Sequence, residues 1–157
     1  MGKEKCCCFT GHRKIGGDFF VDTLARGILY LIDKGVDTFI VGGALGFDTI
    51  CAQEVLKAKK IHPDIKLHVY APCNNQSANW GLRDRMTYNK ILKKADYVDM
   101  PDVPYYDGCM KDRNYKMVDN AAYCICYFNT NTRSGTAQTY RYAQSKGLTI
   151  FNIAGKK

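Results

Sequence analysis

The sequence predicts an α/β protein with a mostly parallel sheet and helices on both faces. Strand-like and helix-like segments alternate along almost the whole chain and are joined by short connections. Three small-residue loops each follow a strand-like segment and lead into a helix-like one, as in open parallel sheets. The 157 residues, 46% hydrophobic and 24% charged, are enough for one globular core. We therefore expect a single domain over residues 1–157.

The strands are predicted from short runs of apolar, β-branched or aromatic residues bounded by turn residues. KCCCFT near the start and AYCICYF near the end are the most apolar and indicate buried strands. We expect six strands, at residues 5–10, 37–41, 66–71, 95–100, 122–128 and 149–153.

The helices are predicted from apolar residues that recur at helical spacing between these strands. In the first helix, Asp18 is expected to cap the start, and Gly35 to take the left-handed position past the end. The least regular segment, PDVPYYDG at 101–108, is expected to be a loop over a site. We expect five helices, at residues 18–33, 48–60, 82–94, 109–120 and 134–146.

Compartment and cysteine usage follow from composition. No apolar run approaches the roughly 18 residues of a membrane span, and the start has no hydrophobic signal core, so we expect a cytoplasmic protein and no membrane partner. The eight cysteines are expected to be reduced thiols rather than a disulfide framework. No CxxC pair occurs and the three histidines lack ligand spacing, so we expect no metal and no cofactor. Five cysteines fall within predicted strands: Cys6, Cys7, Cys8, Cys124 and Cys126.

The net charge of +8 favours anionic partners. The basic residues are spread along the chain, however, and runs such as KAKK at 57–60 and ILKKAD at 91–96 suit solvated helix faces. Charge alone therefore does not require a nucleic-acid partner.

Three loops carry the candidate site: FTGHR (9–13), VGGALGFD (41–48) and RSGTAQT (133–139). Loops after parallel strands converge at the carboxyl edge of the sheet. Glycine and small hydroxyl residues let main-chain N–H groups approach an anion, and the dipole of the following helix favours negative charge. The coincidence of three such loops predicts a pocket for a phosphate-bearing ligand.

Each loop alone has a plainer explanation. The glycines of VGGALGFD could simply turn a strand into a helix capped by Asp48, and Ser134 or Thr136 could be a helix cap. The loop lacks the Gly-Lys-Ser/Thr ending of a P-loop and is not a GxGxxG fingerprint. A kinase, a GTPase or an ordinary dehydrogenase is therefore not expected.

The segment 109–120 adds a fourth candidate element. Met110 and Met117 are expected to pack inward at helical spacing, which leaves Arg113 and Asn114 near the first turns. The guanidinium of Arg113 offers a fixed fork of donors that suits phosphate or carboxylate. The alternative is a surface arginine on an amphipathic helix.

Four motifs in this order resemble the YpsA-like branch of the SLOG superfamily, which groups the DNA-processing proteins Smf/DprA with the LOG enzymes. The resemblance covers residues 9 to about 153 and implies a Rossmann-like sheet and a pocket for a nucleotide-derived ligand. Roles proposed in this family include the sensing of nucleotide-derived signals, sometimes in bacterial or phage conflict systems. The motifs are FTGHR (9–13), GGALGFD (42–48), RNYKMVD (113–119) and SGT (134–136).

The resemblance also implies which residues would contact the ligand. The first loop would edge the pocket, the glycines of the second would approach phosphate or ribose, and Asp48 would accept from a ribose hydroxyl or cap its helix. The remaining residues would complete the phosphate contacts. The implied set is Thr10, Gly11, His12, Arg13, Gly42, Gly43, Ala44, Gly46, Asp48, Arg113, Asn114, Ser134, Gly135 and Thr136.

Departures from the family pattern bear on catalysis. Lys14 stands where proline usually follows FTGHR, and Asn114 stands where LOG enzymes have lysine. Gln138 and Thr139 occupy the positions where LOG enzymes need an acid, and neither can act as a carboxylate. The catalytic residues are therefore unassigned, with Asp48, Glu54 and Asp119 as the candidate acids for a hydrolase.

Three functions follow, in order of preference. The first is the binding or sensing of a nucleoside monophosphate or ADP-ribose-like molecule, and the second is N-glycosidic hydrolysis of nucleoside monophosphates. The third is a nucleic-acid-binding module, ranked last because the basic residues are scattered. Trp80 is the aromatic residue to consider for stacking on a base, against simple packing. The resemblance also raises a homodimer, without deciding it.

Overall fold

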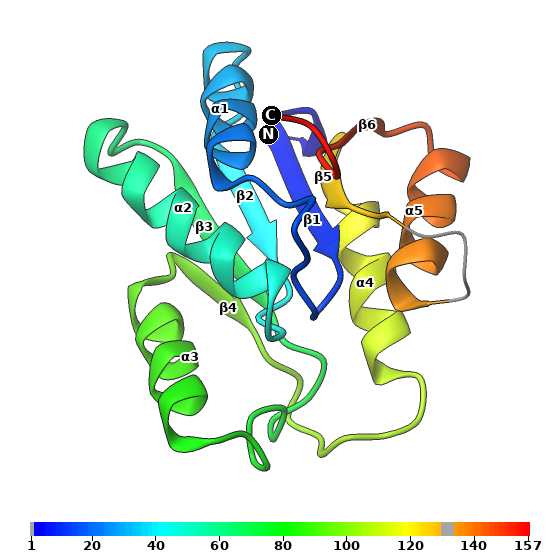
Figure 1. Cartoon of the computed structure of the whole chain (residues 1–157). Helices are drawn as coiled ribbons and strands as arrows, with labels where there is room; N and C mark the ends of the chain where they lie inside the picture. The colour runs from blue at the N-terminus through cyan, green and yellow to red at the C-terminus, as the bar shows by residue number, and fades with distance from the viewer. Residues whose placement is uncertain (1, 130–133) are drawn as a thin grey trace.

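The computed structural model describes residues 2–129 and 134–157, and it confirms the α/β prediction. Six parallel strands form one sheet in the order β4-β3-β2-β1-β5-β6 (Figure 1). All six predicted strands are present, and their bounds differ from the predicted ones by no more than two residues. They are β1 (Cys6–Gly11), β2 (Thr38–Val41), β3 (Lys66–Tyr70), β4 (Tyr97–Asp99), β5 (Tyr123–Tyr127) and β6 (Thr149–Asn152).

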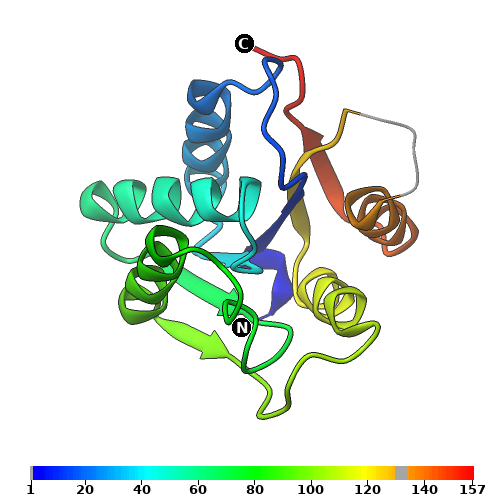
Figure 2. The same ribbon diagram turned by 60° about the horizontal axis from the view of Figure 1, so that its bottom comes forward.

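The five predicted helices cover both faces of this sheet. The chain steps outward from β1 to β4 through α1, α2 and α3, and then returns to the other side of β1 through α4. Because crossovers between parallel strands are right-handed, this reversal puts α4 and α5 on the opposite face (Figures 1 and 2). The helices are α1 (Val21–Asp33), α2 (Phe47–Ile61), α3 (Leu82–Lys94), α4 (Cys109–Asp119) and α5 (Gly135–Ser145).

The central strands are buried on both faces, which explains their continuous apolar sequence. One cluster fills the layer under α1 and α2, with Phe9, Phe39 and Phe47 no more than 1% exposed. A second, smaller cluster under α4 and α5 contains Cys8, Cys124 and Met117. All eight cysteines lie in the described residues as free thiols, and all except Cys6 are buried.

The start of the first helix corrects one prediction. The helix begins at Val21, with Phe20 as its N-cap and no side-chain cap, so the prediction that Asp18 caps it is wrong. The carboxylate of Asp18 instead accepts hydrogen bonds from Tyr127 and Asn129. Gly35 has a φ of 101°, which confirms the left-handed position expected past the helix. A short 3-10 helix, η1 (Lys3–Lys5), precedes β1 and has no signal in the sequence pattern.

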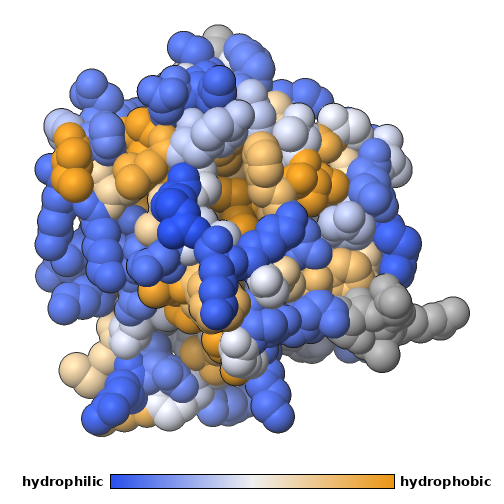
Figure 3. Space-filling view, turned by 45° about the horizontal axis from the view of Figure 1, so that its top comes forward, coloured by the Kyte–Doolittle hydropathy of each residue, from blue (hydrophilic) through white to orange (hydrophobic). Residues whose placement is uncertain are grey.

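The face shown in Figure 3 is mainly hydrophilic, with apolar patches between hydrophilic side chains. Exposed large apolar side chains include Leu82 and Met86 of α3, which are 68% and 61% exposed. Among the described helices, none combines the length and hydrophobicity that a membrane crossing requires.

Candidate functional site

The predicted loops meet at the carboxyl edge of the sheet, where the arrows of β1 and β2 point in Figure 1. The connections after β1 and β5 lead to opposite faces, so these neighbouring strands form the topological switch point at which open sheets bind ligands. A cavity of about 280 Å³ lies there. Eleven of the fourteen predicted residues line it, namely Thr10, Gly11, His12, Arg13, Ala44, Asp48, Arg113, Asn114, Ser134, Gly135 and Thr136, together with Phe9 and Met110.

Gly46 allows the first two loops to pack together. Its φ is 83°, and a Cβ atom there would lie 2.0 Å from the carbonyl oxygen of Arg13. One residue later, the N–H of Phe47 donates to the carbonyl of His12 at 3.3 Å. Only glycine satisfies both the conformation and the close approach. The loop after β1 therefore rests on the start of α2.

Gly42 and Gly43 lie behind the cavity rather than among its lining residues. A Cβ atom on Gly42 would lie 2.7 Å from Cζ of Arg113 and 2.8 Å from Oδ2 of Asp48. Gly43 has a φ of 73°, and its Cβ would lie 2.8 Å from the ring of Tyr88. These two glycines make room for the side chains that line or support the cavity.

Arg113 is the buried cation of the cavity, with only 6% of its surface exposed. Nη1 donates to the main-chain carbonyls of Gly42 and Tyr70, the latter at 3.1 Å, and Nε donates to Oδ1 of Asn114 at 2.8 Å. No carboxylate lies within ion-pair distance of it among the described residues. Burial lowers the pKa of Arg113, although arginine keeps its charge at neutral pH. The guanidinium is thus fixed in place by neutral acceptors, and the negative charge of Asp48 favours its charged form from beyond ion-pair distance.

Asp48 is the buried carboxylate of the cavity, 8% exposed. Its Oδ2 accepts from the N–H of Ala44 at 3.3 Å, within the turn that precedes α2. The N-cap of α2 is Gly46, so the alternative prediction that Asp48 caps this helix is wrong. Burial raises the pKa of Asp48, and the positive charge of Arg113 opposes this shift only in part.

The start of α5 closes another side of the cavity. Ser134 is the N-cap, and its Oγ accepts from the N–H of Ala137 at 3.0 Å. Among the described residues, the N–H groups of Gly135 and Thr136 have no acceptor. The beginning of this predicted loop, including Arg133, lies outside the described residues. Within the described part of the chain, the helix therefore presents two main-chain donors and its positive dipole end beside the cavity.

A hydrogen-bond network beside the cavity was not predicted from sequence. The hydroxyl of buried Tyr127 donates to Asp18 and accepts from the N–H of Gly16 at 3.0 Å. Asn129 donates from Nδ2 to Asp18 at 2.9 Å, and its main-chain N–H donates to Nε2 of His12 at 3.3 Å. No motif signals this network because Asp18 and Tyr127 lie 109 residues apart.

Other candidates lie away from the cavity. Trp80 packs edge-on against Tyr88, with ring centroids 5.2 Å apart, and does not line the cavity. Glu54 binds Lys57 on α2 at 2.9 Å, and Asp119 accepts from the hydroxyl of Tyr142 at 2.7 Å. Of the three candidate acids, only Asp48 is at the cavity. The loop 101–108 contacts the segment after β3, where Asn74 N donates to the carbonyl of Val103 at 2.8 Å.

A larger hollow of about 420 Å³ lies between α1 and strands β5 and β6. Its lining includes the apolar residues Ile125, Ile150 and Phe151, and it contains no residue of the predicted motifs. Within residues 2–129 and 134–157, no group of three His, Cys, Asp or Glu side chains is placed to hold a metal ion. The cavity at the strand ends is therefore the site that the loops and buried charges indicate.

The fold and this cavity define a Rossmann-like α/β protein with polar and charged groups gathered at the switch point of its sheet. Comparison with models of protein families identifies the family of this chain. The YpsA model, described as the YspA SLOG family, matches residues 8–154. The chain belongs to this family, which confirms the resemblance inferred from its motifs.

Relatives in sequence are UPF0398 proteins. That of Halalkalibacterium halodurans is 35% identical over 97 residues, which cover 62% of this chain and 51% of that protein. That of Staphylococcus epidermidis is 26% identical over 108 residues, or 68% of this chain and 57% of that protein. The matched region thus spans about half the length of these relatives.

Two solved structures share the fold, both of DNA processing protein A. The protein from Helicobacter pylori, described for its single-stranded DNA binding mode, superposes with a TM-score of 0.68 at 20% identity. The match covers 94% of this chain and 64% of that one. The protein from Streptococcus pneumoniae gives the same TM-score at 16% identity, covering 96% of this chain and 50% of that one. These identities establish the fold alone.

Proposed function

We propose that the cavity binds a nucleotide-derived small molecule through its phosphate, in the class of nucleoside monophosphates or ADP-ribose. The observation that carries the proposal is the buried guanidinium of Arg113, which no carboxylate balances at ion-pair distance among the described residues. A buried charge is costly unless it is paired, and a phosphate would supply the partner. Within the described part of the chain, Nη2 of Arg113 donates only to the sulfur of Met110, at 3.9 Å.

The other groups around the cavity suit the same ligand. Arg13 is exposed at the rim, and the N–H groups of Gly135 and Thr136 have no acceptor among the described residues. Two arginines therefore face one carboxylate, and that carboxylate, Asp48, has a raised pKa. A helix N-terminus with such donors beside a fixed arginine is an arrangement that favours phosphate.

Volume and polarity limit the ligand class. The cavity of about 280 Å³ is just below the usual volume of small-molecule sites, about 300–1,000 Å³. It suits a phosphate with its sugar, and the rest of a larger ligand would extend over the rim. Asp48 and Thr10 would then accept from or donate to sugar hydroxyls.

Isothermal titration calorimetry tests the proposal with AMP, ADP-ribose, NAD and inorganic phosphate, and with adenosine as the ligand that lacks phosphate. We expect AMP or ADP-ribose to bind and adenosine to bind much more weakly. Arg113→Met should weaken phosphate binding about 10- to 150-fold, because hydrogen bonds to charged groups contribute about 1.5–3 kcal/mol. Arg83→Met on the exposed face of α3 is the matched control and should bind like the wild type.

Thermal unfolding of each variant separates binding from folding, because Arg113 is buried. Arg13→Gln provides a second test that does not depend on a buried position, since Arg13 is exposed. The proposal fails if no phosphate-bearing compound binds at millimolar concentration, or if adenosine binds as tightly as AMP. It also fails if folded Arg113→Met keeps wild-type affinity.

A second candidate function, N-glycosidic hydrolysis, is favoured by one observation. Asp48 is a buried carboxylate with a raised pKa inside the cavity, as a general acid would be. Release of free base from AMP, measured by chromatography, would support hydrolysis, and Asp48→Asn should then abolish it. Absence of release, or equal release by Asp48→Asn, would leave binding as the function.

A further inference from the structure

A groove of about 290 Å³ between α2 and α3 gathers four lysines that the sequence places far apart. The two helices lie side by side on one face of the sheet (Figure 2). Lys57 and Lys60 line the groove from α2, Lys90 and Lys94 line it from α3, and Leu56 and Ile91 contribute apolar contacts. On each helix the two lysines are three or four residues apart, which places them on the same face.

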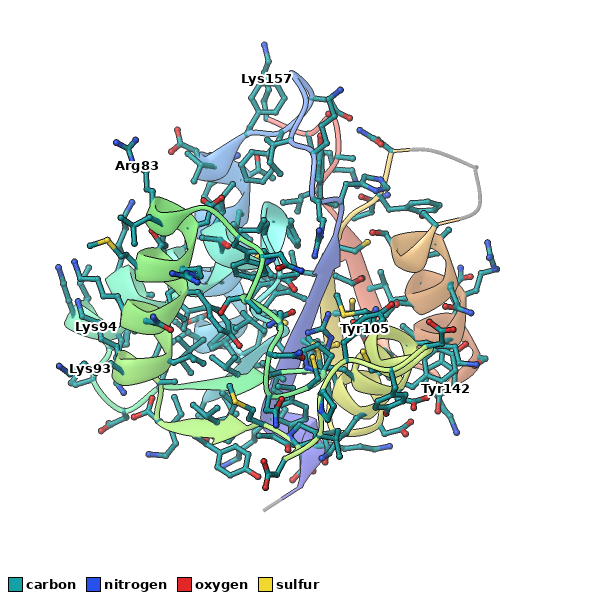
Figure 4. The ribbon with its side chains drawn as sticks, turned by 90° about the horizontal axis from the view of Figure 1, so that it is seen from below. Arg83, Lys93, Lys94, Tyr105, Tyr142 and Lys157 are labelled. Carbon is teal, nitrogen blue, oxygen red and sulfur yellow. The ribbon has the colours of Figure 1, made fainter. Side chains whose placement is uncertain are left out.

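The positive charge of this groove is only partly compensated. Lys57 forms an ion pair with Glu54 at 2.9 Å, in which the lysine side chain is 71% and the glutamate side chain 11% exposed, so the charge of Lys57 is balanced. Among the described residues, no carboxylate lies within 4.0 Å of Lys60, Lys90 or Lys94. The two helices together carry eight lysines and arginines against three carboxylates, one of which is Asp48 in the cavity. In Figure 4, Arg83, Lys93 and Lys94 extend outward from α3.

Helix dipoles explain part of this pattern but not the groove. Lysines in the last turn of a helix are stabilised by its negative end, which accounts for Lys60 and Lys94. Lys57 and Lys90 lie before the last turn, yet they face the same groove. Helix dipoles therefore do not account for the position of Lys57 and Lys90 in this groove.

The residue types of the groove favour phosphate over an acidic protein. Protein interfaces are enriched in arginine and aromatic residues and depleted in lysine, and the described lining of this groove has neither arginine nor an aromatic ring. The lysine ammonium group is a point charge on a flexible chain, so it can bind a backbone phosphate whatever the base sequence. Without an aromatic side chain in that lining, the groove has no platform on which bases could stack.

We propose that the groove between α2 and α3 binds the sugar–phosphate backbone of a nucleic acid without reading its sequence. The groove is separate from the cavity at the strand ends. Lys57 follows Asp48 by nine residues of α2, which is about 14 Å along the helix axis. The proposal therefore does not rest on the nucleotide ligand, and each can fail alone.

Fluorescence anisotropy tests the proposal with a labelled 20-base-pair duplex and a single strand of the same length, at NaCl concentrations from 50 to 300 mM. The groove variant is Lys60→Gln/Lys90→Gln/Lys94→Gln. The control variant, Lys3→Gln/Lys34→Gln/Lys146→Gln, removes the same charge from exposed positions elsewhere and gives the same formal net charge of +5. A difference between the two therefore reports the groove and not the total charge.

We expect the wild type to bind with an affinity that falls steeply with salt. The groove variant should bind the duplex about tenfold or more weakly at 50 mM NaCl. Its salt slope should decrease by about 0.9 for each phosphate that the protein no longer neutralises, or about 0.7 with the single strand. The control variant should keep the wild-type slope. Each single Lys→Gln variant should give about a third of the change in salt slope. The single variants therefore test the proposal even if the triple variant does not fold.

Three results would overturn the proposal. They are no binding of either oligonucleotide by the wild type at 50 mM NaCl, equal weakening by both triple variants, and an unchanged slope in the groove variant. Competition with polyglutamate, at the same concentration of negative charge as unlabelled duplex, tests whether the groove binds acidic proteins instead. If polyglutamate displaces the labelled duplex as well as unlabelled duplex does, the surface is one for acidic proteins. Folded Arg113→Met should bind oligonucleotides like the wild type, which separates this test from that of the cavity.

Discussion

Gly46→Ala tests whether the first two loops of the cavity depend on each other. A side chain at this position must adopt a φ of 83°, and its Cβ must lie 2.0 Å from the carbonyl oxygen of Arg13. A positive φ combined with a ψ of −122° costs at least as much as the left-handed conformation, about 1–2 kcal/mol, and the overlap with main chain costs about a further 1–3 kcal/mol. We therefore expect the free energy of unfolding to fall by about 2–5 kcal/mol, together with loss of nucleotide binding.

Alanine variants of two other glycines separate the conformational contribution to this destabilisation from the steric one. Gly147 has a φ of 76° but open space around its Cβ position, so Gly147→Ala should show only the conformational part, about 1–2 kcal/mol. Gly17 lies in the loop after β1 with no positive φ and no neighbour within 4 Å of the Cβ position. Gly17→Ala should therefore change stability by less than about 1 kcal/mol, and any change should be stabilising.

Urea denaturation of the three variants, followed by circular dichroism, measures these differences. If Gly46→Ala loses no more stability than Gly147→Ala, the close approach of Arg13 to Gly46 is not a constraint. The inference that the second loop supports the first would then be refuted.

Three further predictions concern groups around the cavity. Gly42→Ala should displace the guanidinium of Arg113, since its Cβ would lie 2.7 Å from Cζ; calorimetry should show loss of AMP affinity, and stability should fall by about 1–3 kcal/mol. Asp48→Asn should match the wild type below the ordinary pKa of aspartate and become the more stable protein towards pH 7. Because burial raises the pKa of Asp48, the wild type loses stability as pH rises through that raised pKa. Thermal unfolding of both proteins between pH 4 and 7 tests this. Parallel plots of melting temperature against pH for the wild type and Asp48→Asn would contradict it. Tyr127→Phe should raise the lowered pKa of Asp18 towards its ordinary value in an NMR titration, because the Tyr127 hydroxyl is its strongest hydrogen-bond donor; an unchanged pKa would remove Tyr127 from that role.

Periodicity and turn residues were sufficient to predict the strands and α-helices of the fold, but not the short helix η1. The buried runs KCCCFT and AYCICYF became the central strands β1 and β5, and every predicted helix is present. Such signals are local, and the burial of both faces of a parallel sheet reinforces them. The prediction that Asp18 caps the first helix was wrong because its carboxylate accepts a hydrogen bond from Tyr127 instead. That contact is tertiary, so no local sequence pattern indicates it.

The location of the candidate site was predictable from the sequence, because the topology of a parallel sheet determines it. Parallel strands bring their carboxyl ends together, so three loops placed after strands had to meet. How their glycines act was not predictable, because Gly42, Gly43 and Gly46 support neighbouring groups instead of lining the cavity. The gathering of Lys57 and Lys60 with Lys90 and Lys94 was equally hidden, since about thirty residues separate the two helical segments and their packing decides the result.

The central claim is that a phosphate group occupies the cavity between Arg113 and the start of α5. An NMR titration of ¹⁵N-labelled protein with AMP tests it most directly, because it reports on individual main-chain N–H groups. We predict that the largest shifts fall on Gly135, Thr136 and Gly11 and on the Nε–H of Arg113, and that adenosine does not reproduce them. Shifts that are confined to residues outside the cavity, or that adenosine reproduces equally, would contradict it.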